Sequence, residues 1–217
     1  GFVEAEANWF EYVGYDAAIF RHKASLRHPL GIKKFALPFS IKASLYNKYA
    51  LRDIEKKKDL VGFIGSSIVA PNLYVNRLAA MDKLRDEGLL SETRYLKSIN
   101  RSQMMFGKHY VEFLASNLFG LTCGGYCNYF TAKYLQIPAA HSMLVCTDTV
   151  GLEDFPEDCY IKYDINNLEK LINDIRFHIS NKDIAVEKIK ILYRHVVKNH
   201  NHKIRGKQLR DFIKNRT

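Results

Sequence analysis

The sequence predicts an α/β protein in which a parallel sheet is covered by helices and is followed by two further helices at the C-terminus. Three observations lead to this fold class. Short apolar segments with the character of buried strands alternate with segments of helical periodicity, glycine and proline residues mark the turns, and the last third of the chain has no strand signal. This alternation is typical of a parallel sheet with helices on both faces.

The composition limits the class of protein. A chain of 217 residues that is 47% hydrophobic can bury a full core and should form one domain, or one domain and part of another. No apolar run approaches the ~20 residues that span a bilayer, and the first residues lack the basic and apolar regions of a signal peptide. We therefore expect a cytoplasmic protein without a transmembrane segment.

Two buried strands are predicted in the first part of the chain, at residues 16–21 and 34–41. A lysine-rich segment follows them, and we place a domain boundary there. Residues 1–45 would then be the end of an N-terminal domain or its remnant, residues 46–59 a linker, and residues 60–217 a second domain that includes the C-terminal helices.

The second domain opens with an apolar strand from Leu60 to Ile64, which runs into a glycine- and serine-rich loop. Helical spacing follows over residues 72–87, and Gly88 is placed to end that helix. The alternation continues with expected helices at residues 109–115 and 129–136 and with expected strands at residues 118–122, 142–146 and 159–163.

The last third of the chain is predicted to be helical and basic. Asn166 and Asn167 cap an amphipathic run, and the residues from Asp183 to Lys214 should form two helices, broken around residues 199–202. The net charge of +10 indicates attraction to anions. A solvated helix face explains the basic helices better than a nucleic-acid stripe, because no nucleic-acid motif accompanies them. We therefore do not expect a nucleic-acid partner.

The cysteines favour neither a disulfide framework nor a metal site. Cys123, Cys127, Cys146 and Cys159 are few and lie in apolar or glycine-rich surroundings, which suits reduced, buried thiols. Cys123 and Cys127 have CxxxC spacing, but no second Cys or His pair follows at ligand spacing. We expect no bound metal.

A loop at the carboxyl end of the first strand of the second domain is a candidate binding site. In open parallel sheets, ligands bind where such loops enter helices with unpaired first-turn amides. Gly65 would let the backbone approach a phosphate, and Ser66 adds a donor. The residues around Gly65 do not match the GxGxxG pattern, which disfavours a nicotinamide enzyme.

A second candidate loop follows the predicted strand at residues 118–122. Glycines open a turn, hydroxyl and amide side chains lie at a helix start, and a lysine follows, which could neutralise a diphosphate leaving group. A capped helix with an exposed lysine explains this loop equally well when it is taken alone. The residues concerned are Gly124, Gly125, Asn128, Tyr129, Thr131 and Lys133.

The order of these segments resembles the C-terminal, donor-binding domain of GT-B glycosyltransferases, particularly group-1-like enzymes similar to spore-coat CgeB proteins. The segments are VGFIGSS with PNLYVNRLAAMDKL, FGLTCGG with YFTAKYLQIPAAHSMLVC, CYIKYDINNLEKLINDI, and the His/Arg pattern of HVVKNHNHKIRGKQL. The resemblance covers roughly residues 35–212. It implies a Rossmann-like sheet and the transfer of a hexosyl or deoxyhexosyl group from a nucleoside-diphosphate donor to a hydroxyl of a glycan, a glycoprotein or another acceptor.

The resemblance also implies roles for individual residues. Lys133 and Arg77 would bind the donor diphosphate. Gln136 stands where an acidic residue usually holds the ribose, and Asn128 stands eight positions earlier, where related enzymes have a second acid. An amide still forms hydrogen bonds with ribose hydroxyls but lacks the charge-assisted strength of a carboxylate.

The mechanism implied by the resemblance needs neither a metal nor a cofactor. Negative charge builds on the leaving diphosphate, and helix amides and basic side chains stabilise it. Gly65 and Ser66 would lie near these phosphates. The base that activates the acceptor would come from the N-terminal domain, where His22 and His28 are the candidates.

Two alternatives stay open. The Y-x-T-x-K arrangement in YFTAK also resembles the donor motif of fucosyltransferase-like GT-B enzymes, which differ in donor base and sugar. A non-catalytic module that docks an anionic partner through its basic helices is the other alternative. We also expect the chain to be a part of a longer polypeptide with further domains.

Overall fold

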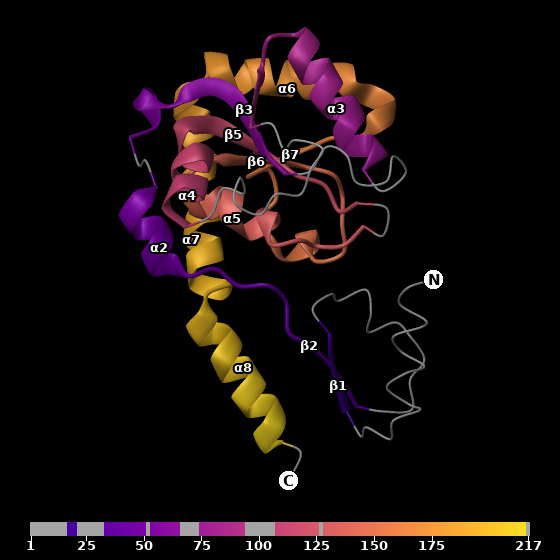
Figure 1. The fold of residues 1–217 in the computed structure, drawn as a ribbon, viewed down its shortest axis with the longest axis vertical. Coiled ribbons are helices and arrows are strands. Elements are labelled where there is room, and N and C mark those ends of the chain that lie inside the picture. The colour runs from indigo at the N-terminus through magenta and orange to yellow at the C-terminus, as the bar shows by residue number, and fades with distance from the viewer. Residues whose placement is uncertain are drawn as a thin grey trace.

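The structure, a computed structural model, describes residues 17–20, 33–50, 53–65, 74–93, 107–125 and 128–215. Within these ranges, five parallel strands form the main sheet, and β1 (Ala17–Phe20) and β2 (Lys33–Ala36) form a separate parallel pair. Helices cover both faces of the main sheet (Figure 1). The predicted α/β fold class is confirmed.

The strand order of the main sheet is β4-β3-β5-β6-β7. The chain leaves β3 to form β4 on one side and then crosses over to form β5 on the other side, so the order reverses between β3 and β5. Such a reversal creates a crevice at the carboxyl ends of the strands. The strands are β3 (Lys58–Ile64), β4 (Leu90–Thr93), β5 (Asn117–Leu121), β6 (Met143–Cys146) and β7 (Ile161–Lys162).

Two hydrophobic cores lie on the two faces of the sheet. In β6, Met143 and Val145 belong to one core and Leu144 and Cys146 to the other, as the period of two in a strand requires. Helices α3 (Val75–Asp86) and α6 (Leu168–Ser180) cover the first face. The second face is covered by α2 (Ala43–Tyr49), α4 (Gly107–Ser116), α5 (Lys133–Ala139) and the second half of α7 (Lys182–Asn199).

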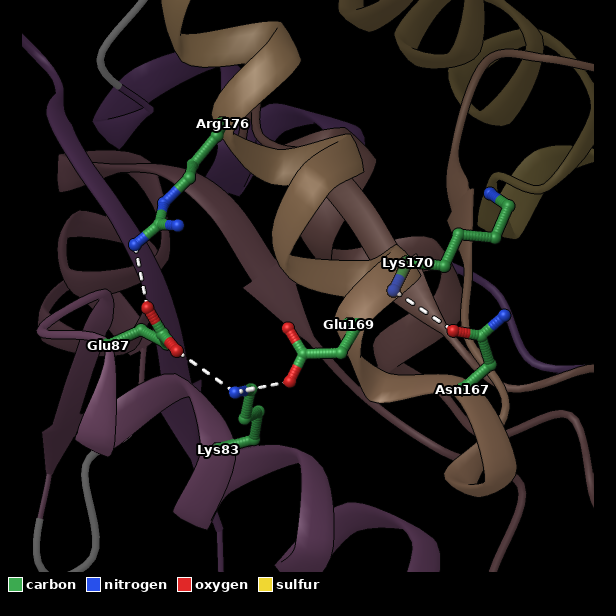
Figure 2. Close-up of polar contacts among 6 residues, drawn as sticks. All are labelled: Lys83, Glu87, Asn167, Glu169, Lys170 and Arg176. Carbon is green, nitrogen blue, oxygen red and sulfur yellow. Dashed lines mark hydrogen bonds and ion pairs between the residues drawn. The ribbon is translucent and has the colours of Figure 1, made fainter.

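Helices α3 and α6 are joined at their surface by ion pairs (Figure 2). The Lys83 ammonium lies 3.0 Å from the carboxylate of Glu87 and 2.7 Å from that of Glu169 on α6. The Arg176 guanidinium of α6 reaches back to Glu87 at 2.6 Å. Basic side chains on this side of the molecule are therefore neutralised by neighbouring carboxylates.

Helix ends agree with the sequence signals. Gly88 follows α3 with a φ of 68°, and the Leu89 amide donates to the Leu84 carbonyl at 2.8 Å, which closes the helix. Asn167 caps α6, and Asn201 caps α8 (His202–Lys214) by accepting from the Ile204 amide at 3.1 Å. The predicted break between the last two helices is confirmed.

The buried side chain of Lys57 joins two helices behind the sheet. Its ammonium donates to the carbonyl of Ala115 at the end of α4 and lies 3.4 Å from the Ala140 carbonyl that follows α5. The Ser142 hydroxyl is also 3.4 Å away. Burial lowers the pKa of Lys57 to about 7.

Several elements differ from the sequence expectations. Residues 43–49, expected to straddle the end of one domain and a linker, form α2, whose Tyr46 is buried in the second core. The short edge strand β4 was not expected. Helix α5 begins at Lys133 rather than at Tyr129. The division into domains stays a prediction.

The last helix leaves the sheet and runs beside the segment that follows β2 (Figure 1). The Ile41 amide donates to the His200 carbonyl at 2.9 Å, and the Arg205 Nε donates to the Pro38 carbonyl at 3.1 Å. The ring of Phe212 stacks on Phe35 at 4.5 Å. No helix in the described parts of the chain combines the length and the apolar character needed to cross a bilayer.

Candidate functional site

The candidate site lies at the carboxyl end of β3, where the strand order reverses. Lys133, the first residue of α5, donates from its ammonium to the carbonyl of Ile64, the last residue of β3. The next residue, Gly65, leaves room for this contact, because a Cβ there would lie 2.6 Å from the Lys133 nitrogen. The lysine predicted from the second loop and the glycine of the first loop are therefore neighbours.

Arg77 of α3 brings a second cation to the same place. Its guanidinium carbon lies 3.8 Å from the ring centre of Tyr74 and 4.9 Å from that of Phe63. The Lys133 nitrogen lies 5.0 Å from the same Phe63 ring. One aromatic ring therefore contacts both cations, an arrangement that attracts each of them through the charge distribution of the ring.

Burial and the neighbouring charge of Arg77 both disfavour the protonated form of Lys133. Burial, and after it the positive charge of Arg77, lowers the pKa of Lys133 to about 8. Burial also lowers the pKa of Arg77, whose side chain is 6% exposed. A bound anion would reverse this effect, because opposite charge at close range favours the protonated form. The crevice is therefore suited to an anion such as a phosphate group.

Gly124 and Gly125 allow the tight turn of the second loop. A Cβ on Gly124 would lie 2.8 Å from the Cα of Asn128, so only glycine lets these backbones approach. The Gly124 amide donates to the Thr147 hydroxyl at 3.1 Å and is therefore engaged within the protein. Gly125 has a φ of 63°, which glycine adopts without strain.

The other residues of this loop lie between the turn and α5. Asn128 adopts a φ of 50°, and its carbonyl accepts from the Thr149 hydroxyl. Tyr129 forms an isolated bridge with Val150. The Thr131 carbonyl accepts from the Tyr134 amide at 3.2 Å and so begins the turn that leads into α5.

Gln136 points its amide oxygen at another helix. The Tyr110 hydroxyl of α4 donates to this oxygen at 2.7 Å, so Gln136 retains its amide N–H groups for another partner. The predicted residues Ser66, His22 and His28 lie outside the described residues. Cys123, Cys146 and Cys159 are buried free thiols, as expected, and Cys127 lies outside the described residues.

A polar cavity of about 500 Å³ lies at the carboxyl ends of β6 and β7. Tyr163 lines this cavity, has Arg77 as a charged neighbour and donates to the Thr122 carbonyl at 3.4 Å. Asn128 lines this cavity and a second one of about 460 Å³. The other polar side chains of the first cavity include Asn76, Thr147, Asp148, Lys162 and Asn167.

Sequence reasoning missed the aromatic residues of the site. From the sequence, Phe63 is predicted only as a buried strand residue, and no residue near it in the sequence indicates that its ring contacts two cations. Tyr163 ends the strand predicted at residues 159–163 and is likewise predicted only as a strand residue. Their roles depend on which helices the fold brings against the strands, and that information is not local.

No protein-family model and no curated protein matches the sequence. Solved structures match across nearly the whole chain. Sucrose-phosphate synthase from Thermosynechococcus elongatus is 13% identical with a TM-score of 0.70, and the match covers 98% of this chain and 61% of that one. HepE from Anabaena in complex with UDP-glucose is 10% identical with a TM-score of 0.73, covering 98% and 67%. An alpha-glucosyltransferase in complex with UDP and a 13-mer DNA is 12% identical with a TM-score of 0.66, covering 98% and 74%.

At these identities the likeness concerns the fold. The chain spans less than two thirds of the length of the first of these structures. The arrangement of a parallel sheet with its flanking helices is nevertheless shared over 98% of this chain. The chain therefore has the Rossmann-like fold found in GT-B glycosyltransferases.

Proposed function

We propose that this chain is the donor-binding part of a glycosyltransferase and holds the diphosphate of a nucleoside-diphosphate sugar at the carboxyl end of β3. The observation that carries the proposal is the meeting of Lys133 and Arg77 at the Phe63 ring, where the strand order reverses. Proteins of the same fold have been solved with UDP and with UDP-glucose. Both ligands carry the diphosphate that two buried cations would attract.

The chemistry of glycosyl transfer uses these cations on the leaving group. Cleavage of the bond between the anomeric carbon and the diphosphate leaves negative charge on the phosphate oxygens. The Lys133 ammonium and the Arg77 guanidinium would neutralise that charge without a metal, because both are already held in the crevice. Preorganised charges of this kind lower the barrier since they need not reorient during the reaction.

The nucleoside would lie toward Gln136. Helix α5 ends at Ala139, and His141, two residues later, has a φ of 58° and stands where the segment K-x-x-E-x-x-A-x-G has its glycine. This left-handed residue supports the placement of Gln136 at the ribose-binding acidic position. Because Tyr110 occupies its oxygen, Gln136 would donate to a ribose hydroxyl rather than accept from one.

The acceptor, the catalytic base and the site of the transferred sugar complete the proposal. The acceptor would be a glycan or a glycoprotein, and the base would come from an N-terminal domain of a CgeB-like enzyme, with His22 and His28 as candidates. The transferred sugar would occupy the polar cavity beside Asn128 and Tyr163. A fucosyltransferase-like donor site is the alternative, and it differs in the nucleotide that it selects.

Thermal unfolding with UDP-, GDP- and dTDP-sugars tests the proposal. A ligand present at 100 times its Kd stabilises a protein by about 2.7 kcal/mol, which corresponds to a rise in Tm of roughly 5–10 °C for a chain of this size. We expect one nucleotide class to give this rise. A rise with UDP would favour the group-1-like donor site, and a rise with GDP would favour the fucosyltransferase-like donor site.

Lys133→Ala should reduce the rise to about half or less at the same ligand concentration, whereas Lys108→Ala, which removes an exposed lysine of α4 paired with Glu112, should leave it intact. The proposal would be abandoned if no nucleotide raises the Tm of the wild-type chain, or if Lys133→Ala responds as the wild type does.

A further inference from the structure

The positive charge of the protein is concentrated in its last two helices. Residues 182–215 contain ten Lys and Arg residues against three Asp and Glu residues, so they contribute seven of the ten net positive charges. The site described above uses none of these side chains. Their arrangement therefore needs its own explanation.

The cations form one continuous row on each helix. At 100° per residue, positions i, i+4, i+7 and i+11, the spacing of the α8 row, fall within about 60° of a helix, and positions i, i+4 and i+8, the spacing of the α7 row, fall within about 80°. On α7 the row lies opposite the buried residues Ile189, Leu192 and Val196. The residues of the two rows, all exposed, are Lys190, Arg194 and Lys198 on α7 and Lys203, Lys207, Arg210 and Lys214 on α8, and we call them the basic face.

Among the described residues, the ion pairs that neutralise Lys83 and Arg176 have no counterpart at six residues of the basic face. Lys83 and Arg176 are paired with carboxylates of α3 and α6 (Figure 2). Within the described ranges, no carboxylate lies within ion-pair distance of Lys190, Arg194, Lys198, Lys203, Lys207 or Arg210. Like charges one helical turn apart disfavour the helix. An anionic partner would remove that repulsion.

The opposite side of α8 fixes the direction in which its row points. Arg205, the buried residue of α8, donates to the Pro38 carbonyl and places its Nη2 2.6 Å from the Nδ1 of His200. Phe212 stacks on Phe35. These contacts lie across the helix from the row, so the cations of α8 lie on the side of the helix away from Phe35 and Pro38.

Aliphatic side chains accompany the cations. Ile184 and Ile191 of α7 are 41% and 38% exposed, and Ile213 of α8 is 54% exposed. Ile184 and Ile191 are seven residues apart and share a line beside the row of α7. Exposed aliphatic groups among lysines suit the boundary between lipid headgroups and acyl chains. A nucleic-acid backbone would use the cations but would gain little from the isoleucines.

We propose that the outward faces of α7 and α8 bind an anionic lipid bilayer peripherally. The basic face would lie against the headgroups, and the isoleucines would enter the boundary below them. This binding is independent of the donor site, because α7 and α8 contribute no residue to the crevice at β3. It would hold the protein at a surface from which a membrane-attached acceptor can be reached.

Sedimentation of the whole chain with vesicles tests the charge part of the proposal. The protein should bind vesicles of phosphatidylcholine with phosphatidylglycerol in equal parts, should not bind pure phosphatidylcholine, and should be released by salt. Each cation removed near an anionic bilayer lowers the partition coefficient roughly fivefold, so K203Q/K207Q/R210Q should bind on the order of a hundredfold more weakly. The matched variant K42Q/K48Q/K108Q, with the same charge change on α4 and around α2, should bind as the wild type does.

A second variant separates lipid from nucleic acid. I184S/I191S keeps the charge, so it should weaken vesicle binding severalfold while leaving any binding to a DNA duplex unchanged. Circular dichroism verifies that each variant keeps the helical content of the wild type. The proposal is overturned if anionic vesicles do not bind or if the two charge variants behave alike. It is also overturned if I184S/I191S binds vesicles as well as the wild type. Together with binding to a DNA duplex, that last result would indicate a nucleic-acid partner.

Discussion

At the scale of single residues, the account depends on how Lys133 reaches the end of β3. The contact of its ammonium with the Ile64 carbonyl needs the open space at Gly65, and Phe63 completes the surroundings of the cation. The positions of the two loops predict that Gly65 and Lys133 lie close together, because loops at the carboxyl ends of parallel strands meet at one edge. Arg77 was a candidate only through the resemblance to GT-B enzymes. The sequence could not predict that the Gly124 amide donates to the Thr147 hydroxyl, because Thr147 is 23 positions away.

Two alanine substitutions separate binding glycines from structural ones. In Gly65→Ala the new Cβ lies 2.6 Å from the Lys133 nitrogen and 3.0 Å from the Phe63 ring, and residue 65 has a φ of 156°, which alanine rarely adopts. We expect this variant to lose about 1–3 kcal/mol of stability and most of the nucleotide-induced rise in Tm. In Gly124→Ala the new Cβ meets the Asn128 backbone, which cannot move alone. We expect this variant to lose about 1–3 kcal/mol in urea unfolding. Gly124→Ala should keep the nucleotide-induced rise in its own Tm, and a Gly65→Ala variant that keeps the full rise would contradict this distinction.

At the scale of elements, helix ends and the breaks between helices could be read from the sequence. Gly88, Asn167 and Asn201 act through contacts within a few residues, so their signals are local. Helix α2 and strand β4 could not be read in this way. Tyr46 is buried because α4 packs on it, and β4 is an edge strand whose pairing with β3 is set by the sheet.

The contact of Lys57 with the ends of α4 and α5 gives stability a dependence on pH. The pKa of Lys57 is lowered by burial from 10.5 to about 7, so above pH 7 the unfolded chain binds more protons at this residue than the folded chain does. The free energy of unfolding should therefore rise with pH from about 7 toward 10, by up to about 1.4 kcal/mol per pH unit. Below pH 7 the residue is protonated in both states, so its contribution to the slope disappears.

Urea unfolding of the wild type and of Lys57→Met from pH 6 to pH 9 measures this contribution. Lys133, whose pKa is also lowered, affects both proteins equally, so the difference between the two profiles belongs to Lys57. The difference should grow between pH 7 and pH 9 and stay constant below pH 7. Parallel profiles over the whole range would show that the buried ammonium does not titrate as proposed.

At the scale of the whole molecule, alternation of strands and helices was enough to predict the parallel sheet and its crevice. Gly65, Arg77 and Lys133 are far apart in the sequence but meet where the strand order reverses. The polar cavity at the carboxyl ends of β6 and β7 was not predictable, because its walls come from β6, β7, α3 and α6 together. The basic face was visible as a charge pattern, but the lack of ion pairs at six of its residues needed the positions of the carboxylates in the described parts of the chain.

The central claim is that Lys133 binds a diphosphate, and calorimetry tests it most directly. The nucleoside diphosphate that stabilises the protein best, and its parent nucleoside, are titrated at pH 7 into the wild type and into Lys133→Met. A hydrogen bond to a charged group contributes about 1.5–3 kcal/mol, so the diphosphate should bind the variant roughly 10- to 100-fold more weakly while the nucleoside binds both proteins alike. Equal affinity of the two proteins for the diphosphate would contradict the account.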